Sequence, residues 1–92
     1  MIRSFRHKGL KRLFEKGNTS GIQCDHIGRI RRILALLATS SSISDMDLPG
    51  LNLHELKGNR RETWAVKVSG NWRITFKYED GDFHIIDYED YH

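Results

Sequence analysis

The stretch TWAVKVSGNWRITFKYEDGDF, residues 63–83, decides the fold because apolar and polar side chains alternate along both of its halves. Alternation with a period of two is typical of a β-strand that buries one face. The apolar positions are Trp64, Val66 and Val68 in the first half and Trp72, Ile74, Phe76 and Tyr78 in the second. Gly70-Asn71 turns the chain between the halves, and Asp80-Gly81 is a strong hairpin signal. The stretch therefore predicts two antiparallel strands and the start of a third.

The third strand is expected over residues 83–91, where the Asp80-Gly81 hairpin pairs it with residues 72–78. Two apolar residues, Ile85 and Ile86, stand side by side in it, which is typical of a strand covered on both faces. We therefore expect this strand not to be an exposed sheet edge. A shorter strand is expected over residues 51–56, and residues 2–5 alternate weakly.

Before residue 50 the apolar period is 3.6, which predicts helices. Residues 8–15 place Leu10, Leu13 and Phe14 at helical spacing, and Gly17 can end that helix. The second helix, residues 23–39, has one apolar stripe. This stripe consists of Ile27, Ile30, Ile33, Leu34 and Leu37. Residues 39–50 are polar and predict a loop with little regular structure.

Helices followed by a meander of strands define the α+β class. We expect two N-terminal helices packed on a small, antiparallel-dominated sheet. A chain of 92 residues has little room for a second core, so residues 1–92 are expected to form one domain.

Composition excludes several classes of protein. No apolar run approaches the roughly 20 residues of a membrane-spanning helix, and the start MIRSFRHKG lacks the apolar stretch of a signal peptide. A single cysteine, Cys24, excludes an intrachain disulfide and a cysteine-based zinc site. We therefore expect a cytoplasmic protein without membrane association.

The charges are unevenly distributed. Residues 1–33 carry nine Lys and Arg against two acids, whereas the last fifteen residues carry six acids and no Lys or Arg. A basic body is typical of a protein that binds a polyanion such as nucleic acid. An acidic partner protein would suit the same surface, and basic residues also keep small domains soluble, so charge alone leaves these readings open.

Arg73 is the first candidate for a functional role, because it lies in mid-strand on the face opposite Trp72 and Ile74. A functional role for Arg73 is favoured only if the neighbouring strand brings acid–base groups to the same face. In a regular strand Asp90 and His92 share a face and Tyr91 points away. His54, in NLHELKG, is a lone histidine of a kind that is more often structural than catalytic. No recognised ligand spacing links the histidines and Asp90, so no metal or cofactor is expected.

If the partner is RNA, cleavage without metal needs a base, an acid and cations that stabilise the phosphate charge. Histidine has a suitable reference pKa of about 6.5, whereas tyrosine (about 10) and aspartate (about 3.9) would each need a shift of roughly three units. His92 is therefore expected to transfer protons, with Asp90 favouring its imidazolium form and so its role as general acid. Arg73 can fork onto two phosphate oxygens, Lys57 adds a point charge, and Tyr91 can stack on a base.

Four segments together resemble the HigB family of RelE/ParE-superfamily toxins. These segments are SFRHKGLKRLFEKG at residues 4–17, HELKG at 54–58, NWRITF at 71–76 and DYEDYH at 87–92. The resemblance runs over nearly the whole chain. It implies the small RelE-like fold and a ribosome-dependent mRNA interferase that cleaves translated mRNA in the 30S A site without metal and arrests growth. It also implies a HigA-type helix-turn-helix antitoxin as partner, with operator DNA bound only through the toxin–antitoxin complex.

The resemblance implies site residues at the positions that match its motifs. His54, Asp90, Tyr91 and His92 would be catalytic, and Lys57 and Arg73 would bind the substrate phosphate. Which histidine is the base stays open. Arg29, Arg31 and Arg32 are candidates for contact with ribosomal RNA, although a solvated face or an antitoxin contact explains them almost as well. A ParE-like gyrase inhibitor and a non-catalytic nucleic-acid-binding module are the alternative functions.

Alternation leaves Tyr91 off the face of Asp90 and His92, but the resemblance includes it in the site. We therefore expect the last strand to stop or twist at about residue 90, so that Tyr91 and His92 both reach the site.

Overall fold

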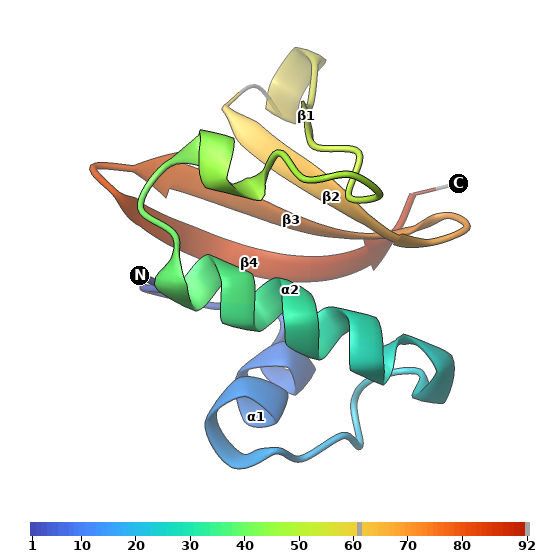
Figure 1. Cartoon of the computed structure of the whole chain (residues 1–92). Coiled ribbons are helices and arrows are strands. Elements are labelled where there is room, and N and C mark those ends of the chain that lie inside the picture. Colours follow the sequence, from blue (N-terminus) through green and yellow to red (C-terminus); the bar gives the residue numbers. More distant parts are fainter. Residues whose placement is uncertain (61, 92) are drawn as a thin grey trace.

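The structure is a computed structural model that describes residues 1–60 and 62–91. Over these residues the chain forms two α-helices, α1 (Lys8–Lys16) and α2 (Ile27–Thr39), and four strands, β1 (His54–Glu55), β2 (Thr63–Ser69), β3 (Trp72–Glu79) and β4 (Asp82–Asp90). Short 3₁₀ helices occur at Cys24–His26 (η1), Ile43–Met46 (η2) and Gly58–Arg60 (η3). The strands make one antiparallel sheet in the order β1-β2-β3-β4 (Figure 1).

The predicted α+β class, with two helices and an antiparallel sheet, is confirmed. The prediction that both helices are N-terminal is wrong for α2, which begins only at Ile27. The strand expected over residues 51–56 is reduced to β1, and the loop expected over residues 39–50 contains η2, whose Met46 is fully buried. None of the helices in the described part of the chain has the length and apolarity needed to cross a membrane.

Both predicted hairpin turns are present. Ser69 pairs with Trp72 across Gly70-Asn71, and Glu79 pairs with Asp82 across Asp80-Gly81. In the second turn both central residues have positive φ, 51° at Asp80 and 85° at Gly81, which is the type I′ geometry that matches the twist of the flanking strands. These local signals fix the order and direction of β2, β3 and β4.

β4 contains one extra residue, which forms a β-bulge. Lys77 pairs with His84 but Thr75 pairs with Asp87, so β4 has one residue more than β3 between these two pairs. The extra residue is Ile85, whose φ of 55° is in the left-handed region and whose exposed fraction is 45%, whereas the next residue in the strand is fully buried. The expectation that the apolar pair at 85 and 86 marks a strand covered on both faces is therefore wrong.

The bulge reverses the face on which every later residue of β4 lies. A hairpin continued regularly from the Glu79–Asp82 pair would place Tyr88 opposite Arg73. Instead Glu89 pairs with Arg73, and Tyr88 pairs with Ile74 on the core face. By the same alternation Asp90, which pairs with Trp72, lies on the core face at the end of the strand.

The outer edge of β4 is covered by the N-terminal segment. Ile2 and Phe5 form parallel bridges with Phe83 and Ile86. The expectation that this strand is not an exposed edge is thus confirmed, but the cover is backbone pairing along its edge.

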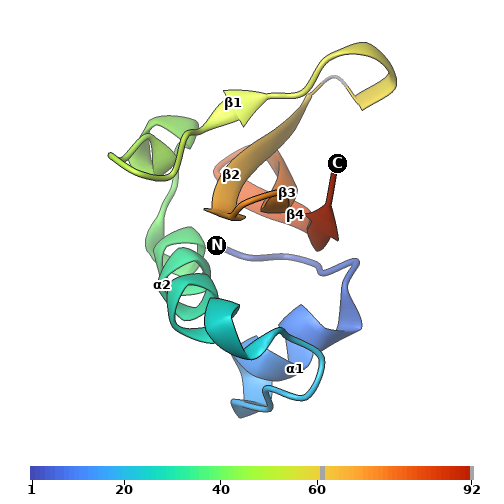
Figure 2. The same cartoon turned by 90° about the vertical axis from the view of Figure 1, so that its right-hand side faces the viewer.

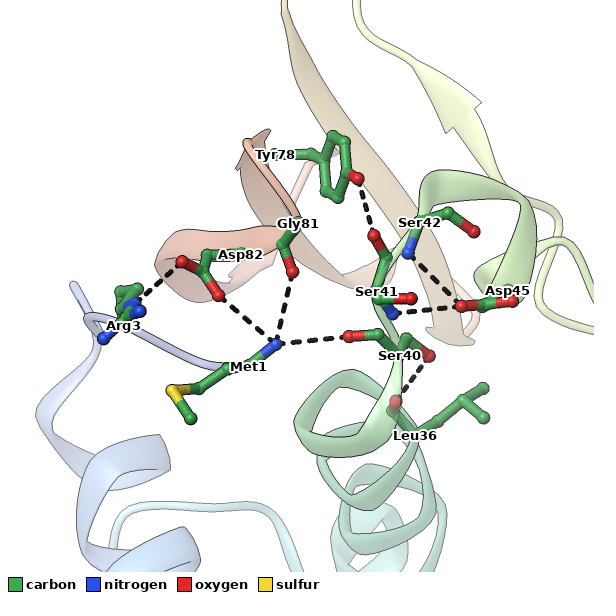
Figure 3. A network of polar contacts seen from close by, with 10 residues as sticks. All are labelled: Met1, Arg3, Leu36, Ser40, Ser41, Ser42, Asp45, Tyr78, Gly81 and Asp82. Atoms are coloured by element: carbon green, nitrogen blue, oxygen red, sulfur yellow. Dashed lines mark hydrogen bonds and ion pairs between the residues drawn. The ribbon is translucent and has the colours of Figure 1, made fainter.

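The α-amino group of Met1 anchors this N-terminal segment to the β3–β4 turn. It donates to the carbonyls of Ser40 (3.2 Å) and Gly81 (3.4 Å), and Asp82 Oδ1 lies 3.6 Å away (Figure 3). Arg3 Nε donates to Asp82 Oδ2 at 2.8 Å, and this hydrogen bond lowers the pKa of the Asp82 carboxyl. The network joins the start of the chain to the end of α2 and to β4.

The helices and the sheet share one hydrophobic cluster, which includes Leu10 and Leu13 of α1, Ile30 and Leu37 of α2, and Phe76 of β3. Both helices lie on the same side of the sheet in the two views (Figures 1 and 2). The opposite face of β3, which carries Arg73, Thr75 and Lys77, is turned away from them, and we call it the open face.

Tyr88 connects several elements of the core. Its ring stacks on Trp72 with centroids 4.6 Å apart, and His7, the N-cap of α1, meets it edge-on. Its hydroxyl lies 2.6 Å from Nδ1 of the buried His26, and both side chains are almost inaccessible to solvent. Burial raises the pKa of the Tyr88 phenol, so the neutral hydroxyl is retained as a hydrogen-bond partner.

We expect Tyr88→Phe to lower the free energy of unfolding by about 1–3 kcal/mol, because it leaves the buried Nδ1 of His26 without its partner. Tyr78→Phe is the matched control: its hydroxyl donates to the Ser41 carbonyl at 2.6 Å in an exposed place. Water can replace that bond, so this variant should lose only about 0.5–1.5 kcal/mol. Urea unfolding of both variants measures the difference, and equal losses would contradict the role assigned to His26–Tyr88.

Candidate functional site

Two arginines share one carboxylate on the open face of the sheet. Arg73 Nε and Nη2 lie 2.9 Å and 2.8 Å from Glu89 Oε1. Arg60, which ends η3, donates from Nη1 to the same oxygen at 2.7 Å and from Nη2 to Oε2 at 3.3 Å. The cluster of Arg60, Arg73 and Glu89 thus carries one net positive charge. Because a guanidinium has five N–H donors, Arg73 keeps donors for a further oxyanion.

Tyr91 completes the surroundings of Arg73. The guanidinium carbon of Arg73 lies 4.3 Å from the centroid of the Tyr91 ring, a cation–π contact. Together with Glu89 this leaves only 12% of the Arg73 side chain exposed, whereas the Tyr91 residue is 54% exposed. The arginine is therefore held in place, and the tyrosine ring still offers much of its surface to solvent.

The position of Tyr91 corrects the analysis of the regular strand. Regular alternation places Asp90 and His92 on the face of Arg73 and leaves Tyr91 out. β4 does end at Asp90, as expected, but the change of face occurs at Ile85, well before the strand end. Asp90 pairs with Trp72 on the other face, although its position at the strand end keeps it exposed. His92 lies outside the described residues.

Glu89 is ionised within this cluster. Its burial favours the neutral acid, but hydrogen bonds and charge from Arg60 and Arg73 outweigh burial and lower the pKa of Glu89 below its ordinary value of 4.5. The carboxylate therefore remains charged at neutral pH and orients both guanidinium groups.

His54 lies on the same face of the sheet as Arg73. It pairs with Ala65, which pairs with Thr75, and Thr75 stands two residues from Arg73 along β3. Strand spacing then puts the Cα atoms of His54 and Arg73 about 12 Å apart. Next to His54 in the row that crosses to Thr75 is Ala65, whose side chain is short, whereas Arg73 lies in the row of Lys67. His54 is exposed, as is Lys57, which follows β1.

The hydrogen bond of His54 defines its tautomer. Nδ1 lies 2.9 Å from the carbonyl oxygen of Asn52, and because a carbonyl only accepts, Nδ1 carries the proton. In the neutral ring Nε2 then has the lone pair. An exposed imidazole with Nε2 available can accept a proton.

The three arginines predicted to contact ribosomal RNA differ in their surroundings. Arg29 is tied into the fold, since Nε donates to the Lys67 carbonyl at 3.1 Å and Nη2 donates to the carbonyl of Gly50. Arg31 and Arg32 are exposed on α2. Arg31 and Arg32 can therefore contact nucleic acid without breaking hydrogen bonds of the kind that Arg29 makes to the backbone.

Glu89 and Arg60 are the site residues that the sequence analysis missed. Glu89 was overlooked because regular alternation places it on the face opposite Arg73, and only the bulge brings the two together. Arg60 lies in a loop whose course no periodic pattern predicts. The available signal was its neighbour Tyr88: if this large aromatic side chain belongs to the core, alternation places the next residue, Glu89, on the opposite face with Arg73.

Comparison with known proteins identifies the class. A family model described as the RelE-like toxin of the type II toxin–antitoxin system HigB matches residues 3–92. A toxin of such a system is paired with an antitoxin. Within this class, the chain belongs to the HigB-like toxin family. It is 48% identical to a protein of Proteus vulgaris named Endoribonuclease HigB, over 92 residues that cover 100% of both chains.

We expect Glu89→Gln to reduce stability at neutral pH by about 1 kcal/mol or less, because partial exposure screens its ion pairs. The folded pKa of Glu89 is lower than its unfolded value. Its contribution is therefore complete only well above the unfolded pKa of 4.5 and is lost as the pH falls through the folded pKa. The difference in unfolding free energy between wild type and variant should shrink from about pH 6 to about pH 3. A difference that stays constant over this range would contradict the ionised Glu89.

Proposed function

We propose that this chain is an endoribonuclease toxin that cleaves mRNA during translation, without a metal ion, and thereby inhibits growth. The observation that supports this function best is the Arg73 guanidinium held between Glu89 and Tyr91 on the open face, with Arg60 beside it. Such a fixed pair of cations suits the phosphodiester of RNA. The name of the Proteus vulgaris relative, Endoribonuclease HigB, supports the same reaction class.

The proposed reaction is a transfer within the RNA backbone. The 2′-oxygen attacks the adjacent phosphorus and loses its proton to a general base, and the bond from phosphorus to the 5′-oxygen breaks. A general acid protonates this leaving oxygen. The products are an RNA end with a 2′,3′-cyclic phosphate and an RNA end with a 5′-hydroxyl. Negative charge on the phosphoryl oxygens grows in the transition state, where positioned cations are most effective.

We assign His54 as the general base, because its Nδ1–H is bound to the Asn52 carbonyl and Nε2 is left as acceptor. His92 is the proposed general acid, with Asp90 two residues before it in the sequence. Arg73 and Lys57 bind the phosphate. Tyr91 orients Arg73 through the cation–π contact and offers its ring to a neighbouring base.

The proposed partners follow from this activity. The substrate is mRNA in the 30S A site of the ribosome, and the exposed Arg31 and Arg32 of α2 would contact ribosomal RNA. A HigA-type helix-turn-helix antitoxin would neutralise the toxin in the cytoplasm, and operator DNA would be bound only through their complex. An adjacent reading frame that encodes a small helix-turn-helix protein is expected, and its absence would count against this partner.

We expect His92→Gln to lower the rate of mRNA cleavage by about 10²–10⁴-fold, since it removes a general acid. Arg73→Lys should also be strongly impaired, because lysine keeps the charge but loses the fork and the contact with the Tyr91 ring. The assay translates a defined message on purified ribosomes and maps the cuts by primer extension. His54→Gln tests the proposed base in the same way.

The same assay separates the alternatives. Charge reversal at Arg31 and Arg32 should raise the ribosome concentration at which cleavage is half-maximal, because ribosome binding is weaker. The positions of the cuts should stay unchanged. A wild-type protein that leaves no cuts, or a His92→Gln variant that cuts as fast as wild type, would refute the catalytic assignment. Inhibition of gyrase by a protein that does not cleave would favour a ParE-like toxin.

A further inference from the structure

A polar hollow of about 190 Å³ lies on the open face next to the Arg60–Arg73–Glu89 cluster. Thr63 and Thr75, both buried, contribute to it from β2 and β3. Arg60 belongs to both the hollow and the cluster. The hollow is smaller than the roughly 300–1,000 Å³ of pockets that enclose a whole small molecule. It therefore suits one part of a larger ligand whose remainder extends over the cluster.

The charges around this hollow favour an anionic ligand. Among the described residues that line it, the cations Arg6, Arg60 and Lys77 stand against one carboxylate, Asp87. Asp87 is 3.9 Å from Arg6 Nε, so it offsets only part of this charge. A phosphate group placed here would be attracted by Lys77 and by the part of Arg60 that Glu89 does not use.

A second hollow, of about 770 Å³, begins on the far side of Ile85 and Lys77, two residues that line both hollows. Its lining includes three carboxylates, Glu55, Glu62 and Glu79. These would repel a phosphate chain. The basic hollow therefore ends at Ile85 and Lys77, and a nucleic acid strand that extends past these residues meets negative charge.

Ile85 is unusual for a residue at this boundary. A β-branched residue with φ of 55° is a steric outlier, and its exposed fraction is 45%. Glycine or asparagine would form the same bulge with less strain. The bulge thus explains the extra residue but not the isoleucine. An exposed apolar side chain beside a cationic hollow is a suitable surface for the face of a nucleobase.

We propose that this hollow binds the nucleotide next to the cleaved linkage of single-stranded RNA. Lys77 and Arg60 hold its phosphate, and Ile85 packs against its base. This inference rests on the proposed endoribonuclease function. It adds a subsite for a flanking nucleotide that determines binding strength and the register of the strand over Arg73.

The first test pairs a protein charge with an RNA charge. Messages carry one neutral methylphosphonate linkage at successive positions on either side of the cut, and cleavage on purified ribosomes is measured against toxin concentration. At one flanking position the half-saturating concentration of wild type should rise about three- to tenfold. Lys77→Gln should show a similar rise with the natural message and no further rise with that modified message. Lys16→Gln, on the far end of α1, is the matched control and should behave as wild type.

The second test separates the side chain of Ile85 from the bulge. Ile85→Gly keeps the bulge and relieves the strain, so its thermal midpoint should equal or exceed that of wild type. We expect its half-saturating concentration to rise about threefold or more, as for the loss of a base contact, with an unchanged maximal rate. Leu48→Ala is the matched control, because Leu48 is exposed to 44% like Ile85 but lies outside both hollows, and this variant should cleave like wild type.

The outcomes distinguish this inference from the function on which it rests. If wild type leaves no cuts, the proposed function fails. Suppose that wild type cleaves but Lys77→Gln and Ile85→Gly have wild-type half-saturating concentrations; the subsite is then refuted and the function stands. The same conclusion follows if the effect of every methylphosphonate position adds to that of Lys77→Gln. Variants that cleave normally yet bind the antitoxin less tightly would make the hollow a protein-binding surface and would also refute it.

Discussion

The arrangement of the site depends on one extra residue in β4. Because the bulge at Ile85 shifts the strand by one position, Tyr88 lies in the core and Glu89 faces Arg73. Two requirements are met by the same shift: the core gains the ring that contacts His26 and Trp72, and the open face gains the carboxylate that orients two arginines. Without the bulge, Asp87 would lie opposite the buried Ile74 in the apolar core, where its carboxylate would be costly to bury.

Glu89 has opposite consequences for stability and for binding. It stabilises the fold by pairing with Arg60 and Arg73, and it also occupies donors that a phosphate would use. Because the pair of arginines exceeds the single carboxylate in charge, the cluster still attracts an anion. The carboxylate lowers the mobility of both guanidinium groups, so less conformational entropy remains to be lost when RNA binds. The site is thus ordered before its ligand arrives.

Much of the fold could be predicted from local sequence signals. The turns at Gly70-Asn71 and Asp80-Gly81 were identified because these residue types tolerate positive φ, and the apolar stripe of α2 was identified by its period. The bulge could not be predicted, since isoleucine is among the residues least suited to the left-handed region. Because the bulge was not predicted, part of the site was not predicted either. Motifs identify Arg73 and Tyr91, but the contact of Arg73 with Glu89 depends on the shifted register of β4. Arg60 was missed because its place depends on a loop contact over a distance of 29 residues.

The N-terminal anchor sets a condition on the timing of folding. The bond from the Met1 amino group to the Gly81 carbonyl joins groups 80 residues apart in the chain. At a synthesis rate of about 5–20 residues per second, the first residue waits roughly 4–16 s for its partner. Until then the segment that covers the edge of β4 has no strand to cover, and Arg73 has not yet met Glu89. A nascent chain therefore carries the arginines of the site well before it can hold them in position, because the sheet is complete only after β4 has been made.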